Sequence, residues 1–268
     1  MAAYQLGVIG GGKMAEAILR AVVGRAVLNH NVILVSEPRR PRRQLLLRDL
    51  QVTCVADNRL AAACPHVLLA VKPQVMADVL DGVAASVRDD AVVISIAAGI
   101  STKFLDGWLG GKGHVVRAVP NAALGVGAGL TAVAAGPRAT GADLHWAGNL
   151  FAACGKVFRV GEDLIDAVAV LAGSGLALFF YLIEAMVSAG VAEGLDADEA
   201  AGLAAGSCAG AARLLAETDE PPEGLRARIT RPGGATQQAI ESLEAAGVKR
   251  ALVEAIRAAA RRSRDLEQ

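Results

Sequence analysis

Over roughly its first 160 residues the chain alternates short apolar runs with amphipathic helical patterns, and this alternation constrains the fold most. The predicted strands are 5–9, 32–35, 67–71, 92–96, 115–118, 130–134 and 157–160, and the main helical segments between them are 14–23, 41–50, 75–87 and 143–153. Strands that alternate with helices form a parallel sheet with helices on both faces. The sequence therefore predicts an α/β domain.

From Asp163 onward the strand signals stop and the pattern is helical to the end of the chain. Asp196 is a predicted N-cap, with Glu199 at the capping-box position three residues later. The predicted helices are 163–193, 197–217, 223–229 and 236–265. We therefore expect an α/β domain over residues 1–161, followed by an all-helical domain over residues 162–268.

Composition and charge exclude several classes of protein. The chain is 53% hydrophobic, which excludes disorder, and its 27 basic and 27 acidic residues leave no basic surplus for nucleic acid. The cysteines at 54, 64, 154 and 208 form no CxxC pair, so we expect reduced thiols and no metal site. No basic stretch precedes an apolar run at the amino terminus, which predicts a cytoplasmic protein without a secretory signal.

Two long charge-free stretches raise the question of a membrane span. Residues 118–137 include Pro120, Asn121, Gly125, Gly127 and Gly129, which do not suit a spanning helix, and residues 167–183 are slightly shorter than the ~20 residues that a bilayer requires. A helix that is apolar all round is more often buried between protein surfaces. We therefore predict a core or subunit-interface helix at 167–183 and no transmembrane segment.

The strongest short motif lies between the first predicted strand and the first predicted helix. Gly10, Gly12 and Ala15 occupy the G-x-G-x-x-A positions of a dinucleotide-binding turn. The first glycine permits the tight turn, the second lets the backbone approach a pyrophosphate, and the alanine permits close helix–strand packing. The helix start supplies N–H donors for the anion. The motif predicts a Rossmann-type dinucleotide-binding domain.

The residues after the second strand bear on which dinucleotide is bound. An acidic side chain there favours NAD(H), because it binds the ribose 2′-OH, whereas serine and arginine favour the 2′-phosphate of NADP(H). The chain offers both kinds, since Glu37 lies between Ser36 and Arg39. We favour NADP(H) on account of Ser36 and Arg39, with NAD(H) as the alternative.

The helical half of the chain is poor in acid–base groups. All four histidines precede residue 162, and the only lysine after that point is Lys249. Reduction of a ketone leaves an alkoxide that needs a proton donor, whereas a protonated imine accepts hydride and becomes a neutral amine. The sequence therefore favours reduction of a C=N bond over reduction of a ketone.

Two glycine-rich breaks interrupt the helical half. Because each glycine in a helix costs about 1 kcal/mol relative to alanine, the Gly-Ser-Gly at 173–175 suggests either close packing at an interface or a bound ligand. The second break, Thr-Arg-Pro-Gly-Gly-Ala-Thr at 230–236, predicts backbone N–H groups that open a helix and form a carboxylate-binding nest. Thr236 adds a hydroxyl there.

Six segments together resemble the pyrroline-5-carboxylate reductase family over essentially the whole chain. They are Gly-Val-Ile-Gly-Gly-Gly-Lys-Met-Ala at 7–15, Leu-Ala-Val-Lys-Pro-Gln at 69–74, Val-Arg-Ala-Val-Pro-Asn at 116–121, Glu-Asp-Leu-Ile-Asp-Ala-Val at 162–168, Gly-Ser-Gly at 173–175 and Pro-Gly-Gly-Ala-Thr at 232–236. The resemblance implies NAD(P)H-dependent reduction of 1-pyrroline-5-carboxylate to L-proline. It also implies that the helical domain forms a homodimer, which can assemble further into a decamer of dimers.

The turn motif, the strand ends and this resemblance define the predicted site residues. The predicted cofactor contacts are Gly10, Gly12, Lys13, Met14, Ser36, Arg39, Asn58, Ala70, Val71, Lys72, Pro73 and Ala97. The predicted contacts to the cyclic imino acid are Glu162, Ser174, Gly175, Gly234, Ala235 and Thr236. The resemblance assigns Thr236 as the catalytic residue, whose hydroxyl bonds the ring nitrogen and assists proton transfer.

The chain departs from the family pattern at several of these positions. It has Asn-Ala-Ala at 121–123 where the family reads Asn-Thr-Pro, Leu176 and Leu178 in place of proline and tyrosine, and Arg231 in place of serine. These departures leave two alternatives open: a reductase of a related cyclic imine such as piperideine carboxylate, and a catalytically weak nucleotide-binding homologue. A β-hydroxyacid dehydrogenase fits less well, because the helical half lacks a lysine at the expected place.

Overall fold

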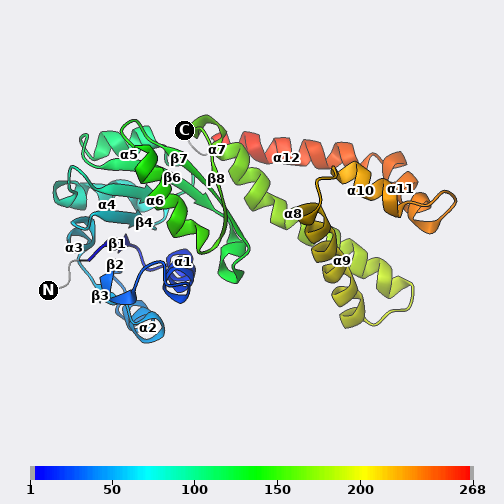
Figure 1. Cartoon of the computed structure of the whole chain (residues 1–268), viewed down its shortest axis with the longest axis horizontal. Coiled ribbons are helices and arrows are strands. Elements are labelled where there is room, and N and C mark those ends of the chain that lie inside the picture. The colour runs from blue at the N-terminus through cyan, green and yellow to red at the C-terminus, as the bar shows by residue number, and fades with distance from the viewer. Residues whose placement is uncertain (1–3, 266–268) are drawn as a thin grey trace. The chain divides into compact units, whose positions relative to one another are not determined.

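A computed structural model describes residues 4–265 and contains one eight-stranded sheet (Figure 1). The strands are β1 Leu6–Ile9, β2 Ile33–Ser36, β3 Thr53–Val55, β4 His66–Leu69, β5 Val92–Ser95, β6 His114–Pro120, β7 Gly129–Ala135 and β8 Gly155–Arg159. Their spatial order is β3-β2-β1-β4-β5-β6-β7-β8. All seven strands predicted from the sequence are present, and only the three-residue β3 was missed.

The direction of one strand pair differs from the predicted all-parallel sheet. All neighbouring strands run parallel except β6 and β7, which are antiparallel with Ala118 opposite Val133. Only a short turn, η4 Ala122–Val126, separates these two strands, and a parallel neighbour needs a crossover of about a dozen residues or more. The prediction of a purely parallel sheet is therefore wrong at this pair.

Helices cover both faces of the sheet. They are α1 Lys13–Gly24, α2 Arg40–Leu50, α3 Asn58–Ala62, α4 Met76–Val83, α5 Thr102–Trp108 and α6 Gly141–Ala152, with 3-10 turns η1 His30–Val32, η2 Pro73–Val75 and η3 Ala84–Ser86. One buried cluster joins Ile18, Leu46 and Phe151 from α1, α2 and α6. A separate cluster joins Leu80 and Leu105 from α4 and α5. These two clusters are the cores on the two faces of a Rossmann-type sheet.

The rest of the chain is helical, as predicted, and its elements are α7 Glu162–Ala169, the π-helical turn η5 Val170–Ser174, α8 Gly175–Ala192, α9 Ala197–Glu217, α10 Pro222–Ile229, α11 Ala235–Ala245 and α12 Val248–Asp265. Asp196 caps α9, where its side chain accepts a hydrogen bond from the N–H of Asp198. The single helix predicted over 236–265 is wrong. It breaks at Gly247, whose φ of +68° lies in the left-handed region, where glycine carries no steric cost.

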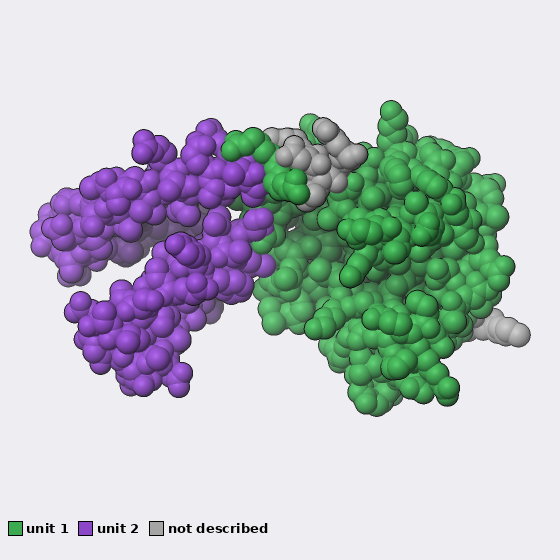
Figure 2. All heavy atoms as spheres, turned by 180° about the vertical axis from the view of Figure 1, so that it is seen from behind, with its two compact units in different colours: residues 1–173, 260–268 green, residues 174–259 purple. Residues whose placement is uncertain are grey.

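The chain divides into two compact units, coloured separately in Figure 2: residues 1–173 with 260–268, and residues 174–259. Inside the second unit α8 packs on α9, where Gly190 lies against the buried Ala200. The predicted domain boundary falls at Gly161, between β8 and α7. The two compact units divide between Gly173 and Ser174, within the helical region, and they do not test where the α/β domain ends. The boundary at Gly161 therefore stays a prediction.

The helical run Glu162–Ala192 is long and apolar enough to cross a membrane by length and composition alone. Its 31 residues include an 18-residue window with a mean hydropathy of 1.9, of which 11% is buried within the chain. Part of this surface is contributed by Phe179, Phe180 and Tyr181, which are all more than half exposed. An apolar surface of this kind requires a partner, either another protein surface or lipid.

Candidate cofactor and substrate sites

The predicted dinucleotide turn joins β1 to α1. Gly10 has a φ of +99°, and a Cβ added there would lie 2.7 Å from the carbonyl oxygen of Ala70. Only glycine satisfies both conditions. Ala15 is fully buried in the first turn of α1, where its small side chain lets the helix approach the sheet.

Gly12 faces open space instead. A Cβ built on Gly12 would meet no atom within 4 Å, although Gly12 is the N-cap of α1. Within residues 4–265, the backbone N–H groups of Gly12, Lys13 and Met14 have no protein acceptor. An open backbone edge with free donors at a helix start suits an anionic pyrophosphate, so the residues present fit a dinucleotide.

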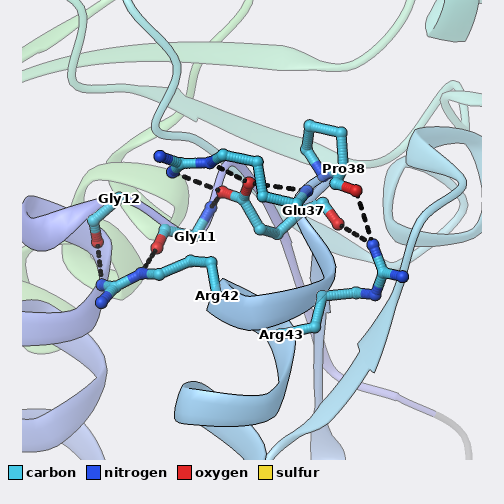
Figure 3. A network of polar contacts seen from close by, with 7 residues as sticks. Gly11, Gly12, Glu37, Pro38, Arg42 and Arg43 are labelled. Carbon is cyan, nitrogen blue, oxygen red and sulfur yellow. Dashed lines mark hydrogen bonds and ion pairs between the residues drawn. The ribbon is translucent and has the colours of Figure 1, made fainter.

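The acidic side chain at the end of β2 is already engaged (Figure 3). Glu37 is only 3% exposed, and its Oε2 accepts a hydrogen bond of 3.1 Å from the N–H of Gly11. Its Oε1 accepts a bond of 2.7 Å from Nε of Arg39. Burial raises the pKa of the Glu37 carboxyl, but these bonds outweigh it and the net pKa is lowered. Glu37 is thus an ionised carboxylate whose oxygens face protein donors.

The two predicted cofactor contacts beside Glu37, Ser36 and Arg39, differ in how exposed their side chains are. Ser36 is fully buried, and its hydroxyl donates a hydrogen bond of 2.7 Å to Oδ1 of Asn58. Arg39 is exposed: its side chain retains 67% of its accessible surface although it pairs with Glu37. In this structure Arg39 is therefore accessible to a ligand, whereas Ser36 holds Asn58 in place.

The remaining predicted cofactor contacts follow the carboxyl ends of β4 and β5. Ala70 and Val71 come directly after β4, and the carbonyl of Ala70 packs against Gly10. Lys72 precedes the turn η2, which begins at Pro73. Ala97 follows β5 and is 3% exposed. Since β1, β4 and β5 are adjacent and parallel, all of these residues lie along one edge of the sheet, where ligands bind in open α/β sheets.

The side chain of Glu162, predicted to contact substrate, is bonded within the first unit. One carboxylate oxygen accepts the N–H of Thr102 at 2.6 Å, and the other accepts the Thr102 hydroxyl. Glu162 also lies 3.9 Å from the buried Arg117, which pairs with Asp166 at 2.8 Å. These contacts attach the first turns of α7 to β6 and α5, and Glu162 would have to leave Thr102 to meet a ligand directly.

The Gly-Ser-Gly break coincides with a π-helical turn, which the sequence did not reveal. A π turn leaves carbonyl groups outside the regular helical pattern, and the carbonyl of Ala172 accepts a hydrogen bond of 2.9 Å from Nδ2 of the buried Asn121. A Cβ at Gly173 or Gly175 would meet nothing within 4 Å. Close packing against the described residues, 4–265, therefore does not explain these glycines, which leaves a subunit interface or a ligand beside Ser174 and Gly175.

The predicted carboxylate nest lies in the second unit, where Gly234 caps α11. The N–H of Gly233 is taken by the side chain of Gln237, and that of Gly234 by the carbonyl of Arg231. Within the described residues, the N–H groups of Ala235 and Thr236 have no acceptor, and both residues are exposed. The donors open to an anion are therefore those of the first turn of α11, beside the Thr236 hydroxyl.

A dinucleotide turn on a Rossmann-type sheet, followed by a helical region, is the arrangement of a nucleotide-dependent oxidoreductase. Family models agree: residues 5–99 match "NADP oxidoreductase coenzyme F420-dependent" and residues 162–266 match "Pyrroline-5-carboxylate reductase dimerisation".

Full-length comparisons are more specific. The chain is 42% identical to the pyrroline-5-carboxylate reductase of Synechocystis sp., covering 98% of each chain, and 37% identical to that of Methanosarcina acetivorans, covering 98% of this chain and 97% of the other. It matches the structure of the Coxiella burnetii enzyme with a TM-score of 0.94 at 32% identity, over 99% of each chain. The chain belongs to the pyrroline-5-carboxylate reductase family.

Some residues that hold the site together were not predicted from the sequence. The sequence presents Glu37 only as a candidate ribose ligand, and Arg42, whose guanidinium contacts the carbonyls of Gly11 and Gly12, is not among the predicted site residues. Thr102 and Arg117 were also missed. A row of arginines at a helix start marks the region as cationic, but long-range partners such as these follow only from the fold.

Proposed function

We propose that the protein reduces 1-pyrroline-5-carboxylate to L-proline with NAD(P)H. The observation that carries this proposal is the 42% identity to a pyrroline-5-carboxylate reductase over 98% of both chains. The free N–H donors at the starts of α1 and α11 support it, because one suits a pyrophosphate and the other a carboxylate. When bound, the nicotinamide supplies the hydride that the C=N carbon accepts.

The protein's own groups bind and orient the reactants in this proposal. The N–H groups of Gly12, Lys13 and Met14 bind the pyrophosphate, and Ala70, Val71, Lys72, Pro73 and Ala97 line the edge of the sheet along which the cofactor lies. The N–H groups of Ala235 and Thr236, with Gly234 as the cap, bind the ring carboxylate. The protonated imine needs no acid from the enzyme before it accepts hydride, so positioning supplies most of the catalysis.

We infer that NADPH is the preferred cofactor. The carboxylate of Glu37 faces Gly11 and Arg39, so it is poorly placed to accept a hydrogen bond from a ribose 2′-OH. The exposed guanidinium of Arg39 offers a cation to a 2′-phosphate. The structure of the Plasmodium falciparum enzyme, which shares this fold with a TM-score of 0.88 at 23% identity, contains NADP.

An initial-rate assay tests the function and the cofactor together. Purified protein is given the five-membered imine with NADPH and with NADH, and the six-membered piperideine carboxylate is run beside it. We expect the highest kcat/KM for the five-membered ring with NADPH. A higher kcat/KM for the six-membered ring would assign the related-imine alternative, and tight NADPH binding without turnover of either ring would assign a catalytically weak homologue.

Replacement of Thr236 is expected to affect the imine and not the cofactor. Thr236→Ala removes the exposed hydroxyl beside the N–H donors of α11, and a lost hydrogen bond to a charged group costs about 1.5–3 kcal/mol. We expect kcat/KM for the imine to fall about tenfold or more, with the Kd for NADPH unchanged. Thr236→Ser keeps the hydroxyl and is the matched control. Equal kcat/KM in both variants and the wild type would remove Thr236 from the site.

We infer that the chain is a homodimer through its helical region. The dimerisation family model begins at residue 162, and the exposed Phe179, Phe180 and Tyr181 on α8 supply an apolar surface for a second copy. Assembly of such dimers into a decamer stays a prediction. Analytical ultracentrifugation tests the dimer: we expect at least two subunits at micromolar concentration, and a stable monomer would contradict the proposal.

A protein partner for this surface also bears on location. A second copy that covers α8 would remove the exposed apolar helix from water without lipid, so we propose a cytoplasmic enzyme without a membrane span. The proposed location therefore depends on the dimer proposed above.

A further inference from the structure

The side chain of Arg42, in the first turn of α2, extends to the dinucleotide turn between β1 and α1 and contacts its carbonyl groups (Figure 3). Its Nε donates to the carbonyl of Gly11, and one terminal nitrogen donates to the carbonyl of Gly12 at 3.0 Å. The same nitrogen pairs with Oε2 of Glu16 in α1 at 2.6 Å. The Arg42 side chain keeps only 16% of its surface, so these contacts are largely shielded from water.

The two carbonyls that Arg42 holds determine the direction of two N–H groups. In a planar trans peptide the C=O and the following N–H point in opposite directions. Fixing the carbonyl of Gly11, for which Arg42 is the donor, therefore fixes the N–H of Gly12. Fixing the carbonyl of Gly12, which accepts hydrogen bonds from both Arg42 and the backbone N–H of Glu16, fixes the N–H of Lys13. These are two of the donors that are free at the start of α1.

The contacts of the neighbouring groups show that the loop is held from both sides. Glu37 accepts a hydrogen bond from the N–H of Gly11, and Arg42 donates one to the carbonyl of the same residue. Glu16 is the counter-ion of Arg42: burial raises the pKa of Glu16, but hydrogen bonds from Arg20 and Arg42 outweigh it and lower the net pKa. The Arg42 guanidinium is thus paired with Glu16, and it donates to the two carbonyls from two different nitrogens. The planar guanidinium has this geometry, whereas the ammonium of a lysine has a single nitrogen.

We propose that Arg42 is a positioning residue for the cofactor: it orients the Gly12 and Lys13 N–H groups toward the pyrophosphate without touching the cofactor. This inference extends the proposed function, but it concerns the binding of the dinucleotide alone. Its test can therefore be run without any imine, and a failure to reduce pyrroline-5-carboxylate would not affect the result.

The test compares two ligands that share the adenosine end of NADPH but differ in the pyrophosphate. In Arg42→Met we expect the Kd of NADPH to rise about tenfold, the equivalent of one lost charge-assisted hydrogen bond or slightly less. The Kd of adenosine 2′-monophosphate should stay within about twofold, because this ligand has no pyrophosphate for the Gly12 and Lys13 N–H groups to bind. Titration calorimetry on the full chain supplies both values.

Two further variants separate the alternatives. Arg20→Met removes the other arginine that pairs with Glu16, without altering the loop, and should leave both Kd values unchanged. Arg42→Lys keeps the positive charge but cannot fork between two carbonyls, so it should resemble Arg42→Met. Full NADPH affinity in Arg42→Lys would mean that charge alone matters. An equal loss for both ligands in Arg42→Met would mean a direct contact to the 2′-phosphate or general damage. Either result would overturn the proposal.

Discussion

Gly12→Val is expected to raise the Kd of NADPH about 100-fold or more while the protein stays folded. The valine side chain would point into the open space beside the turn, where a Cβ meets no protein atom within 4 Å. That space is where the pyrophosphate would approach the N–H groups of Gly12 and Lys13. The loss of two charge-assisted hydrogen bonds at about 1.5 kcal/mol each corresponds to about two orders of magnitude in Kd.

Gly24→Val is the matched control for this variant. Gly24 ends the same helix, and its Cβ would also meet nothing within 4 Å. The φ of Gly12 is −66°, which other residues adopt without strain, so both variants should unfold within a few degrees of the wild type. Unchanged NADPH affinity in Gly12→Val would contradict the placement of the pyrophosphate at this turn.

Gly7→Ala is expected to destroy the fold of the first unit. Gly7 lies in the middle of β1, and a Cβ there would come within 1.9 Å of the backbone carbonyl oxygen of Ala61 in α3. The Cβ position is fixed by the backbone of β1 and the oxygen belongs to the backbone of α3, so neither atom can move without separating the strand from the helix. We expect a loss of more than about 4 kcal/mol in the free energy of unfolding, measured by urea denaturation, or no soluble protein.

Gly82→Ala adds the same methyl group where space is available. Gly82 lies in α4, and its Cβ would meet nothing within 4 Å. Because alanine favours a helix over glycine by about 0.5–1 kcal/mol, this variant should be as stable as the wild type or slightly more so. A Gly7→Ala protein with wild-type stability would show that α3 does not pack on β1 as described.

The predictable parts of the fold depend on local patterns. The run 67–71 is apolar at every position and predicts the strand that the structure has as β4, and the G-x-G-x-x-A spacing located the turn at Gly10 and Gly12. The edge strand β3 was missed because three half-buried residues carry too little periodicity. The break at Gly247 was missed because isolated glycines also occur inside helices.

The candidate site was predictable to a smaller extent. Backbone donors follow from where strands end and helices begin, so the turns at Gly12 and Gly234 could be anticipated. Side-chain partners could not, because they join residues that are distant in sequence. Examples are the Glu37 carboxylate on the N–H of Gly11, the Glu162 carboxylate on the N–H of Thr102, and the Asn121 amide on the carbonyl of Ala172. In each pair a polar group that the backbone leaves unpaired is satisfied by a side chain from another element.

The most direct test of the central claim follows the hydride into the product. Purified protein is supplied with 1-pyrroline-5-carboxylate and with NADPH that carries deuterium at C4 of the nicotinamide, prepared separately with each of the two faces labelled. Mass spectrometry and chiral chromatography then identify the product. We predict L-proline with a single deuterium at C5 from one of the two labelled forms and none from the other. Absence of proline, or proline without deuterium from both forms, would contradict the assignment.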